Sequence, residues 1–128
     1  MPDVFIHNQR FYNPVDYVLH QIGGTWKAPV LWRLKSKKMR YTELQKDIPH
    51  ISQKMLTKTL KALEADGIID KKIFAKVPPH TEYALTKKGS KLILLIESIR
   101  NLGLDLMKEE GIDYEGIIKD EKKNAKDK

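Results

Sequence analysis

Polar and basic side chains recur in one stretch of the chain at a spacing that places them on one side of a helix. Lys54, Thr57, Lys58 and Lys61 follow one another at helical intervals, and Gln53 lies in the first turn. Glutamine can pair with adenine through two hydrogen bonds, lysine reaches guanine acceptors or phosphate oxygens, and threonine can bond to either base or phosphate. This chemistry predicts contact with double-stranded DNA, because the major groove admits an α-helix.

The element that carries these side chains is predicted as a helix over residues 52–66. Ser52 is a typical N-cap, and Asp66-Gly67 is typical of a left-handed helix end. The opposite side of the helix is apolar through Leu56, Leu60 and Leu63. A solvated surface helix is the alternative interpretation. Glu64 weighs against it, because acidic residues occur only at the C-terminal end, whereas an ordinary surface mixes both signs.

The charge of the chain is concentrated in the same region. The 128 residues carry a net charge of +7. Residues 27–91 contain 16 Lys and Arg against 6 Asp and Glu, and the remainder contains 8 against 11. Such a basic region is the electrostatic signature of nucleic-acid binding, although an anionic membrane surface or an acidic protein would also fit it.

Shorter helices precede the basic one. Pro14 can open a helix that Gly23-Gly24 stops, and Thr25 is a candidate N-cap for a helix from Trp26 to about Lys35. Thr42 is a candidate cap for a third, short helix that ends at Pro49, after a connection that can include a short strand. Residues 1–13 show little pattern, and we expect an arm or an irregular lead-in there.

The pattern then changes to a two-residue period. IIDKKIFAK and HTEYALT are strand-like runs on either side of Val77-Pro78-Pro79, which predicts a hairpin over residues 71–85. Its basic side chains, with Arg40 before the third helix, are candidates for contacts to the DNA backbone or minor groove: Arg40, Lys72, Lys76 and His80. The alternative is an edge hairpin whose lysines only prevent aggregation.

A long apolar helix over residues 87–110 follows, with Thr86 as its cap. Its apolar side chains, together with those of the first helix, exceed what a small domain buries alone, and they predict a homodimer. The candidate dimerisation residues are Val15, Val18, Leu19, Leu92, Leu95, Ile96, Ile99, Leu102 and Leu106. The alternative is a helix folded back over its own domain. Residues 111–128 form a polar tail that we expect to be disordered.

Three helices, a basic hairpin and a long final helix define the expected fold class. It is α+β and mainly helical: a winged helix-turn-helix with a two-stranded wing and a long C-terminal dimerisation helix. Residues 14–110 make up this domain, between the N-terminal arm and the tail. The basic helix takes the recognition position in the major groove.

Several stretches resemble the HxlR-type winged-helix transcriptional regulators, which are related to the MarR group. They are IGGTWKAPVLWRL, YTELQKDIPHISQKMLTKTLKALEADGII and VPPHTEYALTKKG, within residues 12–110. The resemblance implies a homodimer on pseudo-palindromic DNA and a role in transcription regulation. It also implies DNA contacts at Ser52, Gln53, Lys54, Thr57 and Lys58, and at the wing near Lys76 to His80.

One departure from the family concerns sensing. Many members carry a cysteine before the proline that opens the first helix, whereas this chain has Asn13 there and no cysteine at all. Thiol-based sensing is therefore excluded. Aromatic residues could line a pocket for a small-molecule effector of unknown identity, but core packing is the more common use: Phe11, Tyr12, Tyr17, Trp26 and Trp32.

Other functional classes find little support. The four histidines are scattered, and no nucleophile motif or phosphate-binding glycine loop occurs, so we expect no enzyme, no metal and no cofactor. The longest apolar run, Leu92 to Ile96, is too short for a membrane span. The absence of cysteine fits a cytoplasmic protein, which we expect. Two alternatives to a sequence-specific regulator stay open: a non-specific architectural DNA binder and a winged-helix protein-interaction module.

Overall fold

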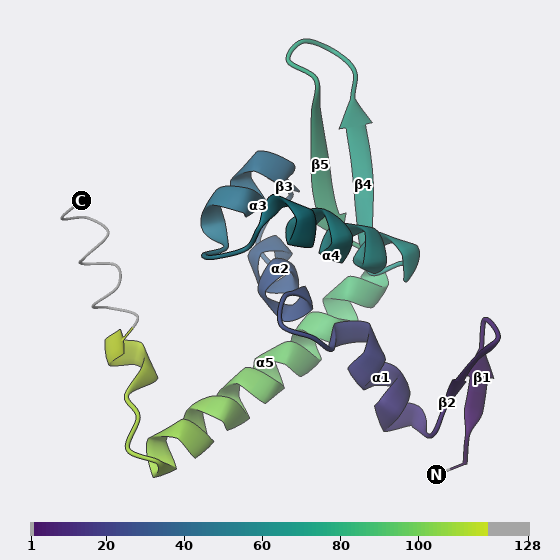
Figure 1. Ribbon diagram of the computed structural model, residues 1–128. Helices are drawn as coiled ribbons and strands as arrows, with labels where there is room; N and C mark the ends of the chain where they lie inside the picture. Colours follow the sequence, from purple (N-terminus) through teal and green to yellow (C-terminus); the bar gives the residue numbers. More distant parts are fainter. Residues whose placement is uncertain (1, 118–128) are drawn as a thin grey trace. The chain divides into compact units, whose positions relative to one another are not determined.

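The structure is a computed structural model that describes residues 2–117. It divides into two compact units, with the division between Ile93 and Leu94. The first unit holds four helices, two small sheets and the start of a fifth helix, and the second holds the remainder of that helix and the residues after it (Figure 1).

Four helices build the first unit: α1 (Pro14–Ile22), α2 (Lys27–Leu34), α3 (Tyr41–Asp47) and α4 (Gln53–Ala65). Pro14 opens α1 as predicted. Asn13 caps it, because the Asn13 Oδ1 accepts a hydrogen bond of 2.8 Å from the Asp16 N–H. The side chain that stands where many family members have cysteine thus has a local structural use.

Two predicted caps are wrong. Helix α2 begins at Lys27 after Trp26, with no side-chain cap, so Thr25 does not cap it. Helix α3 begins at Tyr41 rather than after Thr42. The Glu43 carboxylate accepts a hydrogen bond of 3.1 Å from the Arg40 N–H. A side chain in the first turn of α3 thus pairs with a backbone N–H at the start of the helix.

The core of the first unit lies where the apolar sides of α2, α3 and α4 converge on the base of a three-stranded sheet. Fully buried side chains include Val30 and Leu31 from α2, Leu44 from α3, and Leu56 and Leu63 from α4. Because these positions follow helical spacing, the residues between them remain outside and keep α4 accessible on its other side.

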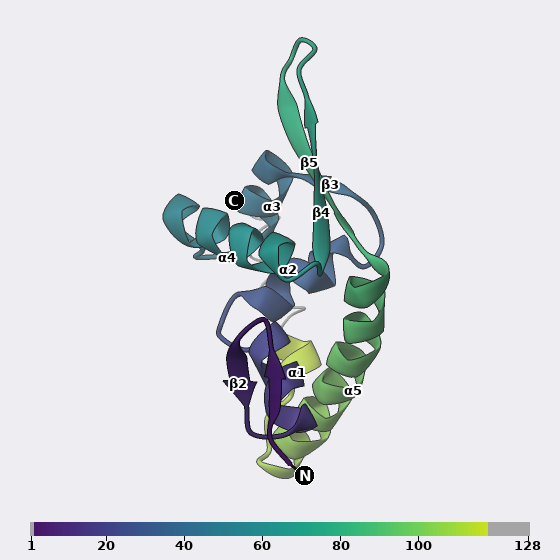
Figure 2. The same cartoon turned by 90° about the vertical axis from the view of Figure 1, so that its right-hand side faces the viewer.

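The three-stranded antiparallel sheet has the order β3 (Met39–Arg40), β5 (His80–Leu85) and β4 (Ile69–Phe74). β4 and β5 form the predicted hairpin, which we call the wing. Both views show its tip extending beyond the helices (Figures 1 and 2). This arrangement of α3, α4 and the wing confirms the winged helix-turn-helix fold class.

The N-terminal residues are more regular than the sequence suggested. β1 (Val4–Ile6) and β2 (Gln9–Phe11) pair as an antiparallel hairpin instead of an irregular lead-in. His7 and Asn8 form its two-residue turn with φ of 51° and 64°, the left-handed values that such turns require. Phe11 is buried, with its ring 5.0 Å from that of Tyr17, and this contact fastens the hairpin to α1.

Helix α5 (Lys87–Glu109) runs from the first unit into the second. The Thr86 Oγ1 accepts a hydrogen bond of 3.1 Å from the Gly89 N–H, which confirms Thr86 as the cap. After α5 the chain turns at Gly111, where φ is 79°, and residues 114–117 are helical. This part of the expected tail is therefore structured, and residues 118–128 lie outside the described residues.

Candidate DNA-binding surface

Helix α4 is held in place by its cap and its buried side. The Ser52 Oγ accepts a hydrogen bond of 3.0 Å from the Met55 N–H, which confirms the predicted cap. Leu56, Leu60 and Leu63 are buried as predicted, and Thr59 joins them with its hydroxyl donating to the Met55 carbonyl at 2.8 Å. The side of the helix that remains accessible is thereby fixed.

The accessible side of α4 carries the side chains that the sequence singled out. Ser52, Gln53, Lys54, Lys58 and Lys61 are all exposed. None of the three lysines forms an ion pair with another residue in the part of the chain that the structure describes. Their charges are therefore available to an anionic partner.

Thr57 differs from its neighbours, because it is only half-exposed and already has a partner. Its Oγ1 lies 2.9 Å from the Tyr41 hydroxyl, which also donates to the Gln53 carbonyl at 3.1 Å. Tyr41 thus joins the start of α3 to the first turns of α4. Sequence reasoning missed Tyr41, because these partners lie 12 and 16 residues away and no local pattern announces them.

The turn between α3 and α4 is held by two further side chains that the sequence did not single out. The Gln45 Nε2 donates to the Ile51 carbonyl at 3.0 Å. An Arg33 nitrogen donates to the Asp47 carbonyl at 3.2 Å. These bonds satisfy backbone carbonyls where regular helical bonding stops, and they fix the angle at which α4 leaves the turn.

The candidate DNA-binding residues of the wing differ in their exposure and in their contacts. Lys72 and Lys76 are exposed, and His80 is half-buried. The His80 ring stacks on Phe74 with 4.6 Å between centroids, and the Lys72 Nζ lies 5.0 Å from the centre of the Phe74 ring. This stack stiffens the outer part of the wing, where Val77 is 95% exposed.

Arg40 and Lys72 share a carboxylate neighbour that the sequence did not reveal. Both pair in register with Glu82 of the central strand β5. Directly opposite residues of adjacent strands lie on the same side of a sheet. The negative charge of Glu82 therefore lowers the positive potential around Arg40 and Lys72. Lys76 lies beyond the end of β4 and has no carboxylate opposite it in the register.

Two groups in the first unit have shifted pKa values. Burial raises the pKa of Tyr83 above 10.0, and the charge of Glu64 acts in the same direction. On the N-terminal hairpin, a hydrogen bond and the charge of Asp3 raise the pKa of the exposed Arg10. Neither shift places a titration near neutral pH, so neither group supplies acid–base chemistry there.

The candidate dimerisation residues fall into two groups. Leu92 and Ile96 are buried within the single chain, and Val18 is half-buried. The remaining six are exposed: Val15, Leu19, Leu95, Ile99, Leu102 and Leu106. Leu94 is also exposed, at 66%, and was not predicted. The exposed group is the one that lacks apolar cover among residues 2–117.

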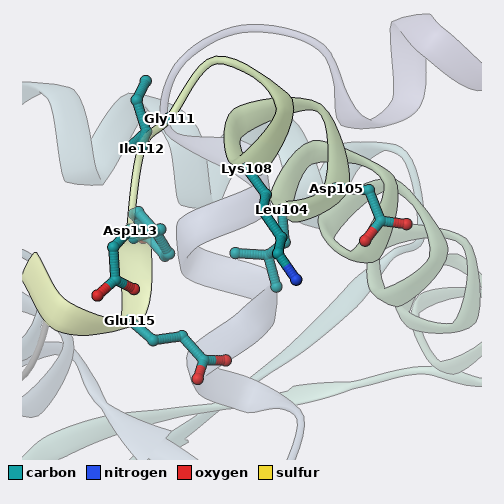
Figure 3. Close-up of a pocket in the computed structure, with 8 residues that line it drawn as sticks. Leu104, Asp105, Lys108, Gly111, Ile112, Asp113 and Glu115 are labelled. Atoms are coloured by element: carbon teal, nitrogen blue, oxygen red, sulfur yellow. The ribbon is translucent and has the colours of Figure 1, made fainter.

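The second unit contains an open hollow at the end of α5. Figure 3 shows Asp105 and Lys108 on α5 and Asp113 and Glu115 on the segment beyond Gly111. Carboxylates outnumber the one lysine in this lining, so its charge is unsuited to DNA. Within residues 2–117 no group of His, Asp and Glu side chains is placed to hold a metal ion. No helix in the same range is long and apolar enough to cross a membrane.

Comparison with known proteins gives consistent relatives. A regulator of the helix-turn-helix type from Methanothermobacter thermautotrophicus is 42% identical over 89 residues, which cover 70% of this chain and 68% of the relative. The regulator YybR from Bacillus subtilis is 35% identical over 113 residues, which cover 86% of this chain and 89% of YybR.

Solved structures agree with these relatives. The helix-turn-helix regulator YtcD has a TM-score of 0.71 at 38% identity, covering 75% of this chain and 98% of YtcD. The oxidised redox regulator HypR has a TM-score of 0.68 at 36% identity, covering 73% of this chain and 96% of HypR. These proteins are transcriptional regulators and not enzymes. The family model for HxlR-like helix-turn-helix proteins matches residues 21–111, and the chain belongs to this family of transcriptional regulators.

Proposed function

We propose that the chain is a sequence-specific transcriptional regulator that binds a pseudo-palindromic operator as a homodimer in the cytoplasm. The observation that carries this proposal is the accessible side of α4, where lysine, glutamine and serine side chains are exposed and the lysines are unpaired among the described residues. A surface of this kind on the second helix of a helix-turn-helix fits the major groove.

The proposed contacts divide into base readout and positioning. Gln53 and Lys54 in the first turn of α4 contact base edges, with Ser52 beside them. Thr57 takes a supporting part, because its hydroxyl is already shared with Tyr41. The other basic residues contact phosphates or the minor groove and carry little sequence information: Arg40, Lys58, Lys61, Lys72, Lys76 and His80.

The proposed homodimer rests on apolar exposure. Leu95, Ile99, Leu102 and Leu106 recur along one stripe of α5 and stay exposed in the single chain. In α1, Val15 and Leu19 are exposed as well. A second copy of the chain would cover such surfaces, and a symmetric dimer would place two recognition helices about one DNA turn, roughly 34 Å, apart.

The redox function in the name of HypR is not proposed for this chain. A thiol switch requires cysteine, and the chain has none. Asn13 instead forms the cap of α1. Any signal that changes DNA binding must act through non-covalent contacts or through other chemistry.

The experiment that tests the proposal is selection of bound fragments from random double-stranded DNA at about 0.15 M salt, the physiological ionic strength. We expect an inverted repeat whose half-site centres lie about one helical turn apart. Enrichment without a shared motif would replace the proposal by an architectural DNA binder. Absence of enrichment would contradict DNA binding and favour a protein-interaction module.

A further inference from the structure

A small cavity in the first unit lies at the point where four segments meet. The N-terminal hairpin, α1, the end of α4 and the start of α5 all contribute to its lining, and its volume is about 140 Å³. A water molecule takes about 30 Å³ in the liquid, so the cavity holds more than one water and suits a molecule of roughly five non-hydrogen atoms.

Gln21 lines this cavity and has a buried polar atom without a partner among residues 2–117. The residue lines the cavity and is only 7% exposed, and its side-chain Oε1 is buried without a hydrogen-bond partner among the described residues. Buried polar atoms are nearly always paired, since an unpaired one costs about 1–3 kcal/mol. The Oε1 is an acceptor, so its missing partner must be a donor, an N–H or an O–H.

A cation lies on another wall of the same cavity. The Lys88 Nζ donates to the Asp66 carbonyl at 2.8 Å and lies 5.9 Å from the centre of the Tyr17 ring, and all three residues line the cavity. An ammonium group has three donors, and the Asp66 carbonyl takes one. The other two donors of Lys88 can bind a carboxylate.

We propose that this cavity binds a small carboxylic acid that also carries a hydrogen-bond donor, a short amino acid or hydroxy acid. Its carboxylate is held by Lys88, and its amino or hydroxyl group donates to the Gln21 Oε1. The acceptor without a donor and the cation with spare donors match the two ends of such a molecule. Phe11 and Tyr17 supply the aromatic part of the wall.

The position of the cavity gives this ligand a regulatory use. Ala65 and Asp66 in the lining are the last residue and the C-cap of α4, the helix proposed to read DNA. A bound molecule would join the end of α4 to α1 and to the N-terminal hairpin and would thereby change DNA affinity. This consequence rests on the proposed function, whereas ligand binding itself does not require DNA.

The test is an NMR titration of the full chain, without DNA, with four probes: glycine, glycolate, acetate and ethanolamine. Glycine and glycolate distinguish an amino acid from a hydroxy acid, and acetate and ethanolamine each carry only half of the pattern. We expect saturable shifts of backbone amide signals around residues 17–21 and 65–66 with glycine or glycolate. Acetate and ethanolamine should bind at least tenfold more weakly.

Variants assign the binding to the two walls. Gln21→Leu and Lys88→Met should each weaken binding about tenfold, the effect of one charge-assisted or desolvated hydrogen bond. Lys87→Met is the matched control, because Lys87 is an exposed lysine immediately before Lys88 in α5 and does not line the cavity. It should bind the probe as the unchanged chain does.

Thermal melting separates folding from binding. Gln21→Leu removes a buried polar group without a partner, so its melting temperature should equal or exceed that of the unchanged chain in the absence of probe. If Gln21→Leu fails to fold, the comparison of Lys88→Met with Lys87→Met decides. The proposal is overturned if neither glycine nor glycolate binds, if acetate binds equally well, or if Lys88→Met leaves the affinity unchanged. A failure of DNA selection would leave this result untouched.

Discussion

Helices α4 and α5 both expose a continuous side, and the two sides have opposite chemistry. From Gln53 to Lys61 the exposed residues of α4 are polar and basic, whereas the exposed stripe of α5 is leucine and isoleucine. The polar side of α4 is well hydrated, whereas the apolar stripe of α5 costs free energy as long as no apolar surface covers it. Exposure alone therefore does not identify a binding surface. The composition of the exposed side indicates which kind of partner would bind there.

Several polar side chains position the start of α4. The first turns of α4 are tied to α3 through Tyr41, and the preceding turn is held by Gln45 and Arg33. Base readout needs such preorganisation, because a helix that moves cannot keep bidentate geometry. An apolar stripe asks less, since hydrophobic contact is not directional. The polar ties at the start of α4 thus suit the base readout proposed for it, and the apolar stripe of α5 suits the proposed dimer.

The largest expected effect comes from placing charge on the apolar stripe of α5. In the double variant Ile99→Glu, Leu102→Glu, two carboxylates would have to be buried in the dimer, which costs at least about 3 kcal/mol and raises the dimer dissociation constant more than a hundredfold. Sedimentation equilibrium measures this constant. Asn101→Glu adds one such charge on another side of α5 and should leave the dimer intact. Equal dissociation in both variants would remove the stripe from the interface.

The next effect concerns the accessible side of α4. Lys54→Ala should weaken operator binding by about 1–3 kcal/mol if Lys54 meets a base, and it should relax the preference at one position of each half-site. Quantitative competition between the selected operator and single-base variants measures both quantities. A uniform loss on all sequences would show that Lys54 contacts phosphate and does not read a base.

A smaller effect is expected on the wing. Lys76→Ala should weaken binding to operator and random DNA by the same factor and reduce the slope of log K against log salt by about one, because one phosphate contact is lost. Affinities at several salt concentrations provide the slope. Lys72→Ala is the informative comparison, because Glu82 lies opposite Lys72 in the register. Removal of the Lys72 charge should therefore lower the slope less than Lys76→Ala does. A loss confined to the operator would contradict a purely backbone contact.

The parts of the molecule that local patterns determine could be predicted from the sequence. The apolar stripe and cap of α4, the two-residue period of the wing and the Thr86 cap were predicted, because each depends on residues within a few positions of one another. The N-terminal hairpin was missed, since strands of three residues are too short to show alternation and His7-Asn8 is an uncommon turn pair.

The candidate site shows the same limit. The exposed lysines of α4 follow from spacing, but their support does not. Tyr41 is tied to α4 across 12 and 16 residues, and Gln45 and Arg33 reach backbone carbonyls that no sequence pattern marks. Among the apolar residues, helical spacing alone could not separate the buried Leu92 and Ile96 from the exposed Leu95 and Ile99, because that division depends on what packs against each side.

The smallest expected effect tests the tie between α3 and α4. Tyr41→Phe removes the hydroxyl that bonds to the Gln53 carbonyl and to Thr57, and it should lower the free energy of unfolding by about 0.5–1.5 kcal/mol. Thr57→Val removes the other partner at nearly constant volume. Because the two changes break one shared bond, their combination should cost less than the sum of the single losses. Urea unfolding of the four proteins measures this coupling. Strict additivity would mean that Tyr41 acts through the Gln53 carbonyl alone. The preorganisation of α4 would then be confined to its first turn.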